Sequence, residues 1–168
     1  MIDLKYILHS VFLVLCVAFQ ATLFNFLEIA GVKPSLFLTY VICVAFFAKE
    51  RETAFIGFIF GLAFDFLIGQ KIGLSAVLYL LVGYFLALGR SYFLSGYNVI
   101  VVAVVVFLAS VLTETIYLFV SLVWRNGIGF WFAFVHVIMI KGLYNAIIAV
   151  IDYFILKKFA LAFADADR

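Results

Sequence analysis

The chain has 168 residues, of which 69% are hydrophobic and 12% are charged, and its formal net charge is +2. A soluble domain is closer to half apolar, so this chain has too few polar residues to cover a folded surface in water. Long apolar runs separated by short charged breaks predict an all-α, polytopic membrane helix bundle. A β-barrel would instead require alternating apolar and polar residues.

Six apolar segments are predicted to be transmembrane helices. The first is too long for the core of a signal peptide and has no Ala-x-Ala cleavage site behind it, so we expect it to be retained. The second begins at Pro34, the only proline, because proline at the first helical position costs no hydrogen bond. In chain order the helices lie near residues 6–27, 34–48, 53–68, 74–88, 99–124 and 131–156, within one membrane domain, 1–168.

The second, third and fourth segments are short for a membrane span. A helix over residues 53–68 is about 24 Å long, against a hydrocarbon core of about 30 Å. Either these helices extend into their loops, or the bilayer thins, or one segment forms a re-entrant hairpin. Five spans are therefore the alternative to six.

The basic residues predict the orientation, because cytoplasmic loops carry an excess of Lys and Arg. Six spans place more of them on the side of the N-terminus, so both termini are predicted to be cytoplasmic. The cytoplasmic set is Lys5, Lys49, Arg51, Arg90, Lys157, Lys158 and Arg168, and the outer set is Lys33, Lys71 and Arg125.

Gly57, Gly61 and Asp65 recur every fourth residue and therefore share one side of the third helix. Two glycines permit the close approach of another helix, and a carboxylate in an apolar span favours contact with protein over lipid. This face is a candidate binding site for a partner's helix.

Two ionisable residues of the last two helices are predicted to pair. Glu114 lies ten residues from Trp124 and Lys141 lies ten residues from Trp131, and the two tryptophans flank the turn of one antiparallel hairpin. They should therefore sit at the same depth and form an intramembrane ion pair. Such a pair ties two helices together, or less commonly serves transport.

Asp65 and His136 both lie near the outer boundary, where they are predicted to form a polar pair or to contact a partner's helix. Gln20 and Asn145 are expected to make interhelical hydrogen bonds. Asp152, near the inner end of the last helix, is expected to meet Lys157 or water.

No catalytic or metal motif is evident, and we predict no enzyme activity, no cofactor and no metal site. The chain has no GxSxG, HExxH or phosphate-cradling glycine loop. Cys16 and Cys43 fall inside apolar runs and are predicted to be buried free thiols. His9 lies close enough to the inner interface to be solvated.

The stretch from Gly57 to Tyr84 resembles the signature region of the MreD family of rod shape-determining membrane proteins. A glycine-x-x-x-glycine-leucine-x-x-aspartate run is followed by a glycine-flanked turn and a second patterned helix, and a Lys-Pro-Ser sequence opens the second span. The matching residues are Gly57, Gly61, Leu62, Asp65, Gly69, Gly73, Leu74, Ala76, Tyr79, Leu80, Gly83 and Tyr84, with Lys33, Pro34 and Ser35.

The resemblance implies a non-catalytic scaffold in the bacterial inner membrane, within the cell-wall elongation machinery. Its expected partners are the bitopic protein MreC and, indirectly, the filament protein MreB and a peptidoglycan glycosyltransferase and transpeptidase pair. The transmembrane helix of MreC would then lie against Gly57, Gly61 and Asp65.

Two other functions are weighed against the scaffold. A substrate-binding membrane subunit of an energy-coupling-factor vitamin importer has a similar size and span count, and the family resembles that fold. Asp65, His136 and Gln20 could line its pocket, although Ala18 and Thr22 give only a degenerate docking motif in the first helix. An enzyme acting on lipid-linked wall precursors would need a cationic clamp, and Arg90, Lys157 and Lys158 are too scattered to form one.

Overall fold

The computed structural model describes residues 2–22, 32–68, 72–93, 98–124 and 137–166, and their side chains over 6–22, 32–68, 72–90, 98–120 and 137–158. The all-α prediction is confirmed, because these residues form six helices and no strand. The helices are α1 (Ile2–Thr22), α2 (Leu36–Ala45), α3 (Glu50–Ile68), α4 (Leu74–Phe93), α5 (Val99–Trp124) and α7 (Ile140–Ala166).

Two helical stretches of the described chain, Val99–Val120 and Val137–Lys158, are long and apolar enough to cross a membrane. Three further apolar helices are shorter: Tyr6–Thr22, Leu36–Ala45 and Leu74–Arg90. Length and composition thus support a crossing for two of the six helices. The six-span topology stays a prediction.

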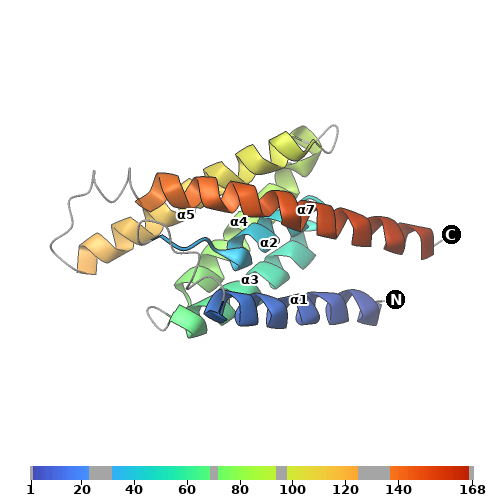
Figure 1. Cartoon of the computed structure of the whole chain (residues 1–168), viewed down its shortest axis with the longest axis horizontal. Coiled ribbons are helices and arrows are strands. Elements are labelled where there is room, and N and C mark those ends of the chain that lie inside the picture. Colours follow the sequence, from blue (N-terminus) through green and yellow to red (C-terminus); the bar gives the residue numbers. More distant parts are fainter. Residues whose placement is uncertain (1, 23–31, 69–71, 94–97, 125–136, 167–168) are drawn as a thin grey trace.

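The short helix α2 forms the centre of the bundle, and the other helices surround it (Figure 1). Ten residues span about 15 Å, which is half of a bilayer core. Every residue from Phe37 to Phe46 is buried. A helix that is apolar all round belongs in the interior, so α2 is short because it is a core element.

An extended segment, residues 32–35, leads into α2, and all of its residues except the partly buried Lys33 are buried. Irregular backbone at this depth is tolerated where protein surrounds it and satisfies its polar groups. Ser35 is the N-cap, and its side chain accepts a hydrogen bond from the Leu38 amide. Pro34 therefore precedes the cap. The prediction that it occupies the first helical position is wrong by two residues.

The remaining helices pack as two pairs with α1 at the side. Helices α3 and α4 form one antiparallel pair, α5 and α7 form the other, and α1 rests on α2 and α3. Tyr40 of α2 connects α1 with α3, because its ring stacks on Phe12 of α1 and on Phe60 of α3. The ring centroids are 3.9 Å and 4.9 Å apart. The start of α1 and the end of α7 lie at the same end of the molecule (Figure 1).

The outer surface of the bundle is apolar. On α7 the exposed side chains recur at helical spacing on the face turned away from α5 and α2, and α1, α4 and α5 show similar stripes. These residues include Val11, Val14, Val77, Leu81, Phe85, Val104, Leu108, Leu112, Leu143, Ile147, Ile151 and Phe154.

Candidate functional site: the glycine face, the Asp65 cap and the polar interior

The glycine face of α3 packs against α4 of the same chain. Gly57 and Gly61 are both buried. A Cβ atom added to Gly57 would lie 2.5 Å from the Tyr79 carbonyl oxygen, and one added to Gly61 would lie 2.6 Å from the Ala76 Cα. Only glycine permits this approach, because side chains essentially never come so close to another backbone. The face predicted to receive a partner's helix is therefore filled by α4, and that placement is corrected.

Asp65 completes the same contact by capping the first turn of α4. Its carboxylate accepts hydrogen bonds from the amides of Gly73 (2.7 Å), Ser75 (3.1 Å) and Ala76 (3.3 Å). These amides have no partner within the helix, and the helix dipole favours a negative charge at this end. Gly73 has a φ of 101°, which suits glycine and turns the chain into α4. Asp65, a residue only 5% exposed, is thus a structural cap.

His136 lies outside the described residues, so its predicted pairing with Asp65 stays a prediction. The contacts that the structure gives Asp65 all come from backbone amides at the start of α4.

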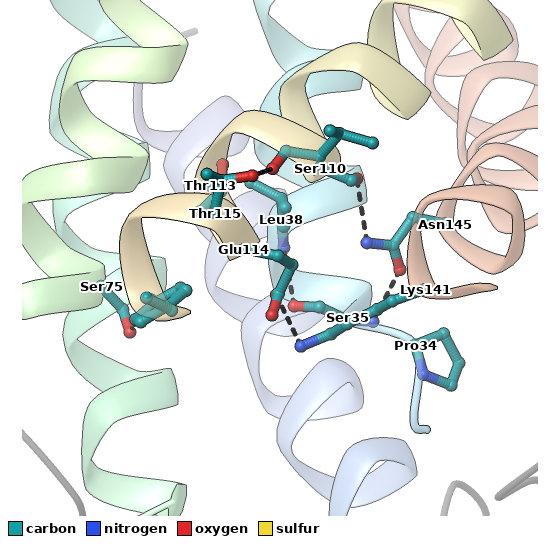
Figure 2. A network of polar contacts seen from close by, with 12 residues as sticks. Pro34, Ser35, Leu38, Ser75, Ser110, Thr113, Glu114, Thr115, Lys141 and Asn145 are labelled. Carbon is teal, nitrogen blue, oxygen red and sulfur yellow. Dashed lines mark hydrogen bonds and ion pairs between the residues drawn. The ribbon is translucent and has the colours of Figure 1, made fainter. Parts of the chain in front are cut away.

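A polar network surrounds the beginning of α2 (Figure 2). The Ser35 amide donates to Asn145 Oδ1 at 2.8 Å, and Asn145 Nδ2 donates to Ser110 Oγ at 2.9 Å. The Ser35 hydroxyl also shares a hydrogen bond of 3.2 Å with the Tyr79 hydroxyl. Ser35 therefore connects the start of α2 with α4 and α7, and Asn145 extends the network to α5.

Helix α1 joins this network through Gln20. Its Nε2 donates to the Pro34 carbonyl at 2.9 Å, and its Oε1 accepts from the Leu36 amide at 3.2 Å. Both groups belong to the irregular entrance of α2. The expectation of interhelical hydrogen bonds is confirmed for Gln20, where the contact is to the backbone, and for Asn145.

Glu114 of α5 and Lys141 of α7 lie together, as the sequence predicted. Lys141 Nζ is 2.6 Å from Glu114 Oε1, and the two side chains are 18% and 12% exposed. In Figure 2 they point toward each other beside Ser35. Ser110 lies four residues before Glu114 on α5, and Asn145 lies four residues after Lys141 on α7. The ion pair and the Ser110–Asn145 hydrogen bond are therefore neighbouring contacts, one helical turn apart, between α5 and α7.

The polar face of α7 continues to Asp152, which is buried against Thr39, whereas the sequence predicted contact with Lys157 or water. Thr39 Oγ1 lies 2.7 Å from Asp152 Oδ2, and the aspartate is 3% exposed. Lys157 instead lies over the Tyr153 ring, 5.8 Å from its centroid. Asp152 points toward α2 because it lies seven residues after Asn145, two turns along the same face.

His9 and the two cysteines also belong to the interior of the bundle. His9 Nδ1 is 2.7 Å from the Tyr40 hydroxyl, so the prediction of a solvated His9 is corrected to a bonded, half-buried one. Cys16 and Cys43 are buried free thiols, as predicted.

The sequence reading missed the hydroxyl partners in this interior, Ser35, Thr39, Ser75, Tyr79, Ser110 and Tyr117. Tyr117 donates to the Ser75 hydroxyl, which places α5 beside the start of α4. Ser35 alone carried a usable signal, because a serine before an apolar run indicates an N-cap. Among the described residues, no buried side-chain nitrogen or oxygen lacks a hydrogen-bond partner, and no cluster of three His, Cys, Asp or Glu could hold a metal.

An all-helical chain with an apolar exterior, inward-facing polar groups and two helices long enough to cross a bilayer is a helical membrane protein. The family model of the rod shape-determining protein MreD matches residues 2–162. The chain therefore belongs to the MreD family, a family of shape-determining proteins. No curated protein and no solved structure matches the chain.

Proposed function

We propose that this chain is a non-catalytic membrane scaffold of the rod-shape cell-wall elongation complex. It docks the transmembrane helix of MreC and through it supports peptidoglycan synthesis, MreB filaments and a glycosyltransferase and transpeptidase pair. The observation that carries the proposal is the family match over residues 2–162. We place the protein in the bacterial inner membrane as a multi-pass bundle with both termini in the cytoplasm, and expect its fold to resemble the membrane subunits of energy-coupling-factor importers.

The polar groups support a scaffold over a transporter. Asp65 accepts a hydrogen bond from the backbone at the start of α4, and Glu114 forms an ion pair with Lys141. Gln20 donates a hydrogen bond to the Pro34 carbonyl just before α2. Each group that the sequence offered for a binding pocket or proton path, within the described residues, therefore ties helices to one another. A rigid bundle with an apolar exterior suits the docking of another membrane helix.

Because α4 already packs against the glycine face of α3, a partner's helix must dock elsewhere, on the outside of the bundle. We propose that the MreC helix packs on one of the exposed apolar faces. Each of five helices offers an exposed position for a photo-crosslinking amino acid, with side chains between 57% and 67% exposed. These positions are Val14, Phe66, Phe85, Leu112 and Ile147.

The test is co-expression with MreC, crosslinking in cells and purification of the tagged chain in mild detergent. Adducts with MreC should form from one helix face or from two adjacent helices. The same amino acid at buried Phe60 is the control and should give none. Failure of MreC to co-purify, together with no adduct from any exposed position, would overturn the scaffold proposal.

A further inference from the structure

Basic residues from α4, from α7 and from the start of α3 lie around the end of α2. Arg90, from the last turns of α4, donates from Nη1 to the Ala48 carbonyl at 3.2 Å. On the other side, Phe47 packs on the Tyr153 ring of α7 with centroids 5.6 Å apart, and Lys157 lies over that ring. The residues after α2 are thus flanked by cations from α4 and α7.

Three more cations at this end are exposed: Lys49 and Arg51 at the start of α3, and Lys158 on α7. Glu50 and Glu52 lie in the same first turn of α3 and are partly buried. Among the described side chains that are not fully buried, five cations stand against two carboxylates here, which makes this group of residues positive. We call this set, Lys49, Arg51, Arg90, Lys157 and Lys158, the basic end.

An exposed apolar stripe leads to the basic end along α7. Leu143, Ile147, Ile151 and Phe154 lie on one exposed face, and the next position on that face is Lys158. From Leu143 to Phe154 the stripe is about 17 Å long, roughly one leaflet of a hydrocarbon core of about 30 Å. An acyl chain along this stripe would therefore end with its headgroup at Lys158.

We propose that the basic end binds the phosphate headgroups of anionic phospholipid, with the acyl chains against the exposed stripe of α7. The charge is complementary, and cations beside an exposed apolar surface attract anionic lipid. Arg90 contacts the Ala48 carbonyl and Lys157 contacts the Tyr153 ring. Lys49, Arg51 and Lys158 are exposed. The proposal is independent of MreC.

The experiment uses the full chain in a neutral detergent, titrated with phosphatidylglycerol or phosphatidylcholine, with bound lipid counted by native mass spectrometry. The wild-type protein should prefer phosphatidylglycerol. The triple variant Lys49→Gln, Arg51→Gln, Lys158→Gln should lose that preference by roughly tenfold or more. Its unfolding temperature should stay near the wild-type value, because all three side chains are exposed.

A matched pair of single variants locates the effect. Lys158→Gln and Lys33→Gln remove the same charge, but Lys33 lies before the start of α2, sixteen residues from Lys49, the nearest residue of the basic end in the sequence. Only Lys158→Gln should weaken the preference. Equal retention of both lipids by the wild type, equal losses in the two single variants, or displacement by millimolar inorganic phosphate would each overturn the proposal.

Discussion

The two helix pairs of this bundle are joined in opposite ways. Between α3 and α4 the backbones touch, because Gly57 and Gly61 leave no side chain between them and Asp65 binds the amides of the next helix. Between α5 and α7 the contact is made by side chains, as the Glu114–Lys141 ion pair and its neighbouring hydrogen bond show.

The two helix pairs should therefore differ in how they tolerate substitutions at their contacts. A backbone contact has no freedom to adjust, so any added side chain forces the helices apart. Where side chains make the contact, one of the two can be replaced and its neighbours can repack, but the remaining polar group is then left without a partner in an apolar setting. The α3–α4 pair should therefore be the less tolerant of substitution.

The largest effect is expected from Gly61→Leu. The new side chain would meet the backbone at Ala76, 2.6 Å from its Cβ position, so α3 and α4 must separate. We expect a loss of about 3 kcal/mol or more in stability, the upper end of overpacking effects. Thermal unfolding of the purified protein in detergent measures it.

The matched control is Phe66→Leu, which puts leucine on the exposed face of the same helix. Its unfolding temperature should change little. A Gly61→Leu protein that unfolds like the wild type but no longer captures MreC would restore the glycine face as the partner site.

An intermediate effect is expected from Asp65→Leu. The substitution leaves the amides of Gly73, Ser75 and Ala76 without their acceptor in a buried place. Unpaired buried groups cost about 1–3 kcal/mol. Hydrogen exchange should accelerate at these three amides first. Unchanged exchange there would contradict the capping role, whatever the global stability.

The smallest effect is expected from the ion pair. Glu114→Gln and Lys141→Met should each destabilise by about 1–2 kcal/mol, because the pair is partly exposed and its remaining member can find water or a neighbouring hydroxyl. The double variant should lose less than the two single losses added together. Strictly additive losses in a double-mutant cycle would show that the two side chains do not interact.

The sequence was most informative where helix geometry places two polar residues at the same depth in neighbouring helices. Glu114 and Lys141 each lie ten residues from a tryptophan that flanks the predicted turn, so helix geometry predicts that they meet. Gln20 and Asn145 are polar residues in apolar helices, and such residues need partners. The sequence could not name these partners, because Ser35, Ser110 and the Pro34 carbonyl lie far away in the chain.

The amino-acid sequence by itself determined the class of protein, the six helices and the face that bears Gly57, Gly61 and Asp65, because these follow from composition and helical period. Only the tertiary structure decided that α4 occupies this face and that Asp152 meets Thr39, 113 residues away. The physical reason is that periodicity identifies which side of a helix must be covered. The helix that covers it depends on how all the others pack.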